Sequence, residues 1–134
     1  MSDKNRREDP EACLQDIIDA ADAIDRYTDG VTEDQFGKHE MRQDAVIRRI
    51  EVIGEAADRL MKAVPEHETS FPGLPLADAK RMRNFVIHGY DGVDFCRVWD
   101  TGVNDIPSLR DKAAHLLDKR RAARAMAGTD LPQP

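Results

Sequence analysis

The strongest structural signal in this sequence is a long amphipathic stretch between Met41 and Val64. Its apolar residues alternate steps of four and three positions, which puts them along one side of an α-helix, the seam that bundled helices bury. Gly54 lies beside this seam, where the missing side chain lets another helix approach closely. Pro65 follows and predicts the end of the helix. The seam consists of Val46, Ile50, Ile53, Ala57, Leu60 and Val64.

Other helices are indicated by the same periodicity and by capping residues. Apolar residues recur at spacings of three and four after Pro10, which suits a first helical turn. Thr32 and Gln35 form the capping-box pattern of a short helix that ends near Gly37. Residues 65–76 contain three prolines and a glycine and predict a loop. We expect helices over residues 10–27, 32–37, 41–64 and 76–88, from 94 onwards, and over about twenty residues after Pro107, which forces a break or restart.

The composition fits one all-α domain. The chain has 134 residues, of which 40% are hydrophobic and 34% charged, enough apolar material for one modest core. We expect an up-and-down bundle of four to six helices over residues 10–127, between flexible ends at 1–9 and 128–134. No apolar run approaches the ~20 residues that span a bilayer, and the charged N-terminus does not resemble a secretory signal. Two distant cysteines, Cys13 and Cys96, fit a reducing, cytoplasmic location, and we interpret both as small buried residues.

Metal and cofactor motifs are missing from the sequence. The four histidines, His39, His67, His88 and His115, lie in four different segments, and no pair has the spacing of a helical metal site. Neither a GxGxxG nor a P-loop pattern occurs. We therefore expect no metal and no cofactor. The net charge of -6 argues against a general DNA-binding protein but leaves RNA open.

Residues 80–90, KRMRNFVIHGY, concentrate the polar chemistry of the chain. Asn84 and His88 are four residues apart and share a helix face, so the amide can orient the imidazole. Arg83 has a side chain long enough to reach the cleft that we expect beside Asn84 and His88. Histidine exchanges protons near neutral pH, and arginine binds phosphate oxygens. Together they are the minimal set of groups for cleaving a phosphodiester without a metal ion. From spacing alone, a surface arginine and a histidine at a helix C-terminus are the more ordinary interpretation.

The pattern Arg83–Asn84–xxx–His88–x–Tyr90 resembles the Arg-x4-His-x-Tyr signature of the HepT-like toxins, a branch of the HEPN domains. The likeness extends over about residues 12–118. Residues 14–28, 43–60 and 82–94 resemble the first helix, the long central helix and the motif helix of that family. Val98–Trp99 and the run from Asn104 to Leu109, with its Asn-Asp-hydrophobic-Pro-x-Leu order, are also similar to family segments.

The resemblance implies an all-helical homodimer that acts as a metal-independent endoribonuclease. Such a protein is the toxin of a type II-like toxin–antitoxin system, and a minimal nucleotidyltransferase antitoxin neutralises it. The resemblance also implies that Arg83 and His88 form the catalytic pair and that Tyr90 receives AMP from the antitoxin. Asn84 matches the polar residue that commonly follows the arginine in the family. The rival interpretation is a catalytically idle module that binds a nucleotide or a nucleotidyltransferase and only sequesters or positions it.

Several features lie outside the family pattern or carry two interpretations. Pro72-Gly73-Leu74-Pro75 replaces a loop that often holds an aromatic residue in the family. The basic segment KRRAAR, residues 119–124, is an addition that we interpret as a solvated helix end, with an RNA contact as the alternative. Lys80 and Arg81 are candidates for steering RNA, although surface charges usually serve solvation. Phe95 and Trp99 share spacing with Val98, so we expect them in the core rather than stacked on bases.

Overall fold

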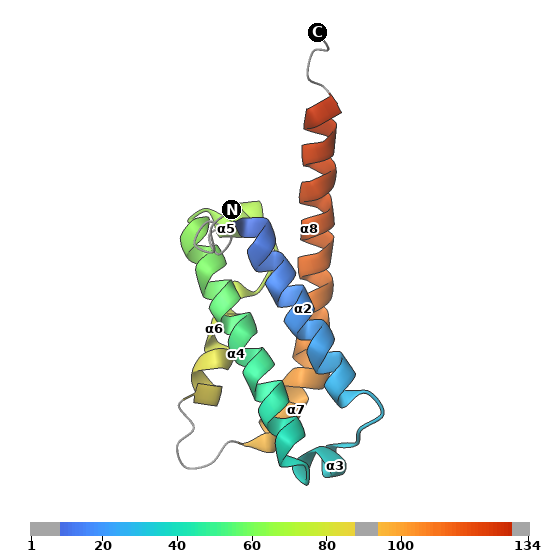
Figure 1. Cartoon of the computed structure of the whole chain (residues 1–134). Coiled ribbons are helices and arrows are strands. Elements are labelled where there is room, and N and C mark those ends of the chain that lie inside the picture. The colour runs from blue at the N-terminus through green and yellow to red at the C-terminus, as the bar shows by residue number, and fades with distance from the viewer. Residues whose placement is uncertain (1–8, 88–93, 130–134) are drawn as a thin grey trace.

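The computed structural model describes residues 9–87 and 94–129, and every regular element within these ranges is a helix (Figure 1). The all-α fold predicted from the sequence is therefore confirmed. Four helices of twelve or more residues, α2, α4, α6 and α8, make up most of the described chain. The elements are α2 (Pro10–Thr28), α3 (Glu33–Gly37), α4 (Glu40–Ala63), α5 (His67–Ser70), α6 (Leu76–Ile87), α7 (Phe95–Asp100), the π-helical turn η1 (Thr101–Asp105) and α8 (Ile106–Thr129).

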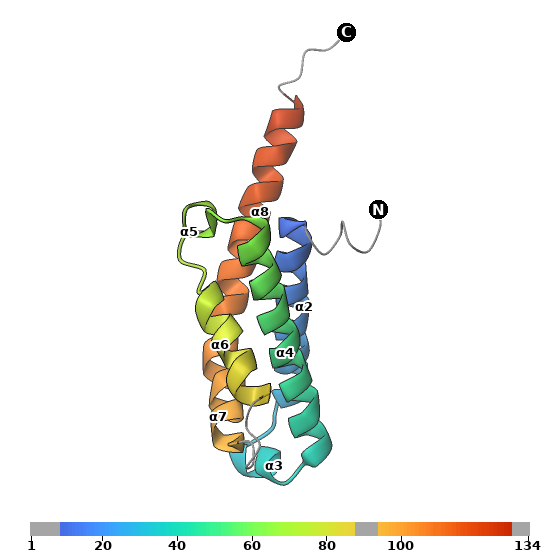
Figure 2. The same cartoon turned by 90° about the vertical axis from the view of Figure 1, so that its left-hand side faces the viewer.

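The long helices pack in the order α6, α4, α2, α8. Helix α4 packs on both α2 and α6, and α2 packs in turn on α8 (Figure 2). The predicted seam of α4 is buried in this bundle, because each of its residues from Val46 to Val64 is at most 8% exposed. The seam therefore leaves no apolar surface that a second copy of the chain would be needed to cover. Among the described residues, the large hydrophobic side chains that stay exposed are Met41 and Met126.

Capping side chains set the starts of three helices where the sequence predicts them. The Asp9 carboxylate accepts a hydrogen bond from the Glu11 amide at the start of α2. Thr32 and Gln35 form both hydrogen bonds of the predicted capping box of α3, at 3.1 and 3.0 Å. Asp94 accepts from the first amides of α7, as its place before Phe95 suggests.

Two local predictions need correction. The segment 65–76 is not entirely loop, since its middle forms the single helical turn α5. Pro107 does not interrupt the helical path, because the chain stays helical from Phe95 to Thr129. Proline offers no amide hydrogen to the preceding turn, and the ladder adapts by widening. In η1 the Ile106 amide donates to the Thr101 carbonyl, five residues back, just before the proline.

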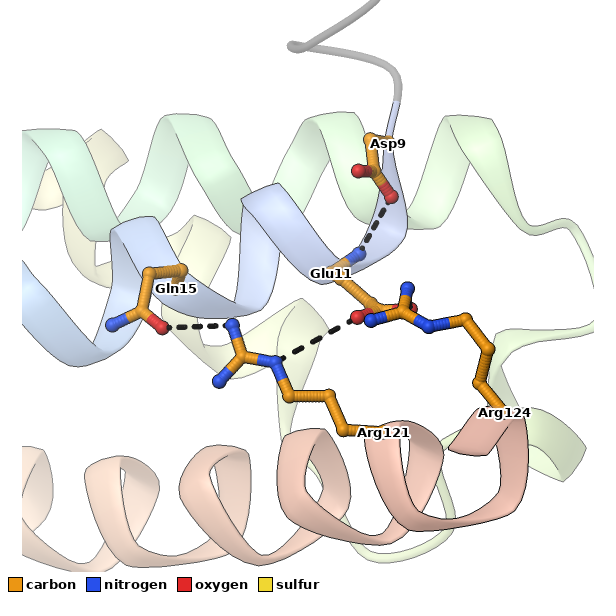
Figure 3. A network of polar contacts seen from close by, with 5 residues as sticks. All are labelled: Asp9, Glu11, Gln15, Arg121 and Arg124. Atoms are coloured by element: carbon orange, nitrogen blue, oxygen red, sulfur yellow. Dashed lines mark hydrogen bonds and ion pairs between the residues drawn. The ribbon is translucent and has the colours of Figure 1, made fainter. Parts of the chain in front are cut away.

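Helix α8 extends well past the end of the bundle, toward the C-terminus (Figures 1 and 2). The basic segment 119–124 lies where α8 leaves the bundle, beside the first turns of α2, and contacts the rest of the chain. Arg124 and Arg121 approach the Glu11 carboxylate at 2.5 and 3.7 Å, and Arg121 also donates to the Gln15 side-chain oxygen (Figure 3). Arg120 stacks over the Phe71 ring at 5.2 Å. The three arginines thus join α8 to α2 and to the segment after α5, so the segment is more than a solvated helix end.

No helix in the described part of the chain combines the length and the apolar character needed to cross a membrane.

Candidate functional site

The arginine of the motif lies where α6 crosses closest to α4. A Cβ atom placed on Gly54 would lie 2.3 Å from the Arg83 Cβ and 3.1 Å from its Cγ and Cδ. No real side chain tolerates the first of these distances, so the Arg83 stem occupies the space that glycine leaves free. The close helix approach predicted for Gly54 is confirmed, and the approaching helix belongs to the same chain. The contact with Gly54 therefore fixes the position of the Arg83 side-chain stem, which carries the guanidinium.

Arg83 differs from the other arginines that are held in the bundle. Buried Nε atoms without a hydrogen-bond partner among the described residues occur in Arg59, Arg83 and Arg120. Arg59 has an ion pair with Asp16 at 3.2 Å, and Arg120 has the Phe71 ring. For Arg83, no ion pair and no ring contact lies within residues 9–87 and 94–129. Its charge is half-buried and uncompensated there, which favours an anionic ligand.

The neighbouring cations of α6 are paired. Lys80 Nζ lies 3.0 Å from the Asp58 carboxylate of α4, and Arg81 pairs with Asp78 one turn earlier on α6. Lys80 thus has a structural role, because its ion pair joins α6 to α4 one turn from the contact between Gly54 and Arg83. An RNA contact by Lys80 or Arg81 stays a prediction, and it would compete with these carboxylates.

Asp58 is a residue that sequence reasoning missed. Its side chain is 17% exposed and lies between Lys62 at 2.9 Å and Lys80 at 3.0 Å. The hydrogen bond from Lys62, followed by that from Lys80, holds the pKa of Asp58 below its usual value. The spacing of four residues to Lys62 is visible in the sequence, but the pairing with α6 depends on how the helices dock.

Replacing Asp58 by asparagine is expected to lower the melting temperature at pH 7 by about 2–4 °C. A carboxyl group with a lowered folded pKa contributes its stability above the unfolded pKa and loses it as the pH falls through the folded one. The gap between wild type and variant should therefore close as the pH falls below about 4. Thermal unfolding followed by circular dichroism at several pH values measures this gap. Asp118→Asn removes an exposed carboxylate of α8 that has no ion pair in the described chain, and should show no such pH dependence.

Asn84 follows Arg83 on α6 and is exposed, on the wall of a groove between α6 and α8. The groove has a volume of about 760 Å³ and is also lined by residues of α7 and η1. His88 and Tyr90, the other two residues of the motif, lie outside the described residues. The described part of the site thus consists of a fixed, uncompensated cation with a polar groove on the adjoining face of the same helix.

Of the remaining predictions from the sequence, those for Trp99, Phe95 and Cys13 are confirmed and that for Cys96 is wrong. Trp99 packs on Phe36, with ring centroids 5.3 Å apart, and Phe95 also packs against the core, so both are confirmed as packing residues. Cys13 is buried as predicted, and burial raises the pKa of its thiol. The prediction for Cys96 is wrong: the first turn of α7 buries Val98 and leaves Cys96 exposed. No group of three or more potential metal ligands occurs in the described part of the chain.

Comparisons with known proteins agree on one family. A family model described as "Ribonuclease HepT-like" matches residues 17–116, which include every residue of the motif. The chain is 38% identical over 100 residues to "Probable ribonuclease HepT" of Thermococcus cleftensis, covering 74% of this chain and 87% of that protein. It is 34% identical over 104 residues to "Putative RNase MJ1216" of Methanocaldococcus jannaschii, covering 78% and 84%.

A third relative is longer than this chain. "Gamma-glutamylcyclotransferase and putative RNase MJ0434" of Methanocaldococcus jannaschii is 34% identical over 113 residues, which are 84% of this chain. The chain spans half the length of that relative. No solved structure matches the chain significantly. The basic segment 119–124 lies beyond the residues that the family model matches, as expected of an addition to the family pattern. The all-helical fold, the motif and the match over residues 17–116 together show that the chain belongs to the HepT-like ribonuclease family.

Proposed function

We propose that this protein is an endoribonuclease that cleaves RNA without a metal ion. The observation that carries the proposal is the state of Arg83, whose stem is fixed against Gly54 and whose charge has no partner among the described residues. A positioned cation of this kind stabilises the negative charge that develops on a phosphate during cleavage. Membership in a ribonuclease family supports the same conclusion.

The proposed reaction is an attack by the RNA on its own backbone, and it requires one base and one acid. The 2′-hydroxyl of RNA loses its proton to a base and attacks the adjacent phosphorus. The bond from phosphorus to the 5′-oxygen breaks, and that oxygen gains a proton from an acid, which leaves a 2′,3′-cyclic phosphate and a 5′-hydroxyl end. Arg83 stabilises the phosphorane, His88 exchanges one of the two protons, and Asn84 orients the imidazole or a phosphate oxygen.

The reaction requires two proton-transfer groups, whereas the motif supplies one histidine per chain. We propose that a homodimer combines the motif helices of two copies in one site, with one histidine as base and the other as acid. The buried seam of α4 does not argue for a dimer, so the proposal rests on the need for a second proton-transfer group. A strictly monomeric protein that still cleaved RNA would contradict it, and sedimentation at micromolar concentration makes the test.

The activity test is incubation of purified protein with single-stranded RNA in EDTA. We expect cleavage of RNA but not of DNA, because the 2′-hydroxyl is the nucleophile, and cleaved ends that carry a cyclic phosphate. His88→Ala should reduce the rate by about 10²- to 10⁴-fold. His115→Ala, which removes an exposed histidine from α8, is the matched control and should cleave like wild type. Ends that carry a 3′-hydroxyl would refute the mechanism, and no cleavage at all would favour a non-catalytic interaction module.

We propose further that a nucleotidyltransferase antitoxin inactivates the protein by transferring AMP to Tyr90. The modification attaches the α-phosphate of ATP to the tyrosine oxygen and releases pyrophosphate. The added phosphate would lie seven residues beyond Arg83 in the chain, where it can compete with RNA for the guanidinium and repel its backbone. This proposal rests on the resemblance of the motif.

Tyr90→Phe tests the proposal, because phenylalanine keeps the ring and removes the oxygen that accepts AMP. We expect the variant to remain toxic in cells that also express the nucleotidyltransferase, while wild type is neutralised. Intact-mass spectrometry should show an AMP increment on wild type and none on the variant. Tyr27→Phe removes the other tyrosine hydroxyl of the chain and should be neutralised like wild type. Neutralisation of Tyr90→Phe, with no increment on wild type, would mean that control works by another route.

A further inference from the structure

We propose that the groove between α6 and α8 binds a nucleobase of the RNA substrate, next to the phosphate that Arg83 contacts. The proposal rests on the ribonuclease function above and adds a site that would give the enzyme a base preference. Helices α6 and α8 occupy the two ends of the packing order α6, α4, α2, α8. An open space of about 760 Å³ lies between them, within the size range of small-ligand sites.

The charge of the groove fits a base rather than a phosphate. Three basic side chains line it, and three carboxylates line it as well, so its formal charge is balanced. Two of these charges, Arg81 and Asp78, are paired with each other. A groove of zero net charge has little attraction for a polyanion but offers hydrogen-bond donors and acceptors to a neutral, polar ring. Arg83, on the adjoining face of α6, supplies the positive charge that a phosphate requires.

The groove is lined by both apolar and polar side chains, and a flat polar ring requires both. Met82 is half-buried and Leu109 is 2% exposed, and both line the groove. Asn104 of η1 and Ser108 of α8 line one side of the groove, Asn84 of α6 lines the other, and all three are exposed. An apolar surface accepts the face of a base, and amide and hydroxyl groups read its edges.

The Asn104 amide is held in a defined orientation. Its Nδ2 donates to the Asp100 carboxylate at 2.6 Å, one helical turn earlier. The Asn104 carbonyl oxygen has no hydrogen bond within the described residues and is available as an acceptor for a base N–H. An amide that is already fixed loses little side-chain entropy when it binds.

The π-helical turn is an independent observation that points to this groove. Thr101 and Asn104 both belong to η1 and both line the groove. Turns of this kind are rare and occur often at functional sites, because the wider ladder redirects side chains at some cost in stability. Here the widened turn forms one wall of the groove, opposite the helix that carries Arg83 and Asn84.

The placement relative to Arg83 matches the geometry of one nucleotide. Arg83 and Asn84 are consecutive residues, so their side chains leave α6 about 100° apart around the helix axis. One face of α6 therefore presents a cation toward α4, and the next face forms the groove wall. A nucleotide carries its phosphate and its base on different sides of one sugar. The two faces can hold both parts at once.

The experiment compares wild type with Asn104→Ala in cleavage and in binding. Cleavage of a random-sequence RNA pool, read by sequencing the new ends, should show a base preference in wild type at one position beside the cleaved bond. Asn104→Ala should flatten this preference and raise KM by about tenfold, with kcat nearly unchanged. Gln15→Ala removes a side-chain amide from α2, away from the groove, and should match wild type.

Binding is measured separately with four 2′-O-methyl hexanucleotides, one for each base, which cannot be cleaved by 2′-hydroxyl attack. Wild type should discriminate among them, and Asn104→Ala should bind all four about equally. If wild type cleaves RNA but Asn104→Ala keeps both its base profile and its affinities, the groove proposal is wrong and the proposed function stands. If wild type cleaves no RNA but discriminates among the four hexanucleotides, and Asn104→Ala does not, the proposed function is wrong and the groove proposal is supported. If wild type shows no base discrimination in either assay, the groove proposal is also refuted.

Discussion

Replacing Arg83 by glutamine is expected to lower kcat for RNA cleavage by about 10²- to 10³-fold. Glutamine keeps part of the stem that packs against Gly54 and removes the charge. Because no ion pair of Arg83 exists among the described residues, the variant leaves no carboxylate there without a partner. The melting temperature should therefore stay within a few degrees of wild type, because the substitution removes an uncompensated half-buried charge.

Arg110→Gln is the matched control for this substitution. Arg110 lies on α8 and pairs with Asp22 of α2 at 2.9 Å, on the side of the bundle away from α6. Its loss breaks an ion pair, so Arg110→Gln should cost some stability and leave kcat unchanged. Single-turnover cleavage assays and thermal unfolding on both variants make the comparison. If Arg83→Gln cleaves RNA with the kcat of wild type, the guanidinium has no role in the mechanism.

Much of the fold follows from local signals in the sequence. The alternation of steps in α4 predicted a helix that the structure places at Glu40–Ala63, because a stripe of apolar residues can be buried only if the chain is helical. Asp94 and the capping box at Thr32 also act locally, so their hydrogen bonds could be read from spacing. Local signals failed where tertiary context decides, as in the turn α5 inside a segment rich in proline.

The sequence indicates residues for the candidate site but not their contacts. The motif proposes Arg83 and Asn84, and the sequence marks Gly54 as a point of close approach. Which helix approaches Gly54, and which cations of α6 find carboxylates, depend on how α4 and α6 dock. Docking is set by the shape of whole helix surfaces, which periodicity does not encode. The same reason explains Cys96, whose exposure follows from the orientation of α7.

Replacing Gly54 by alanine is expected to impair both stability and catalysis. Alanine in the middle of a helix is ordinarily favoured over glycine by about 1 kcal/mol. Here the new Cβ would lie 2.3 Å from the Arg83 Cβ, an atom that can move only if α6 moves with it. The gain in helix propensity is then outweighed by overpacking, which costs about 1–3 kcal/mol. Displacing α6 also displaces the guanidinium, and misplacement by about 1 Å can cost up to a hundredfold in rate.

Two controls separate these effects. Gly37→Ala adds the same methyl group at the end of α3, where nothing lies within 4 Å of the new Cβ, and should leave stability and kcat at or above wild type. Leu117→Ala removes a buried side chain from α8, which packs mainly on α2, and destabilises the bundle without adding an atom between α4 and α6. Measured well below the melting temperatures, Leu117→Ala should cleave RNA like wild type while Gly54→Ala loses about tenfold to a hundredfold in kcat. Equal rates in the two variants would mean that Gly54 serves packing alone, and that Arg83 reaches its working position without it.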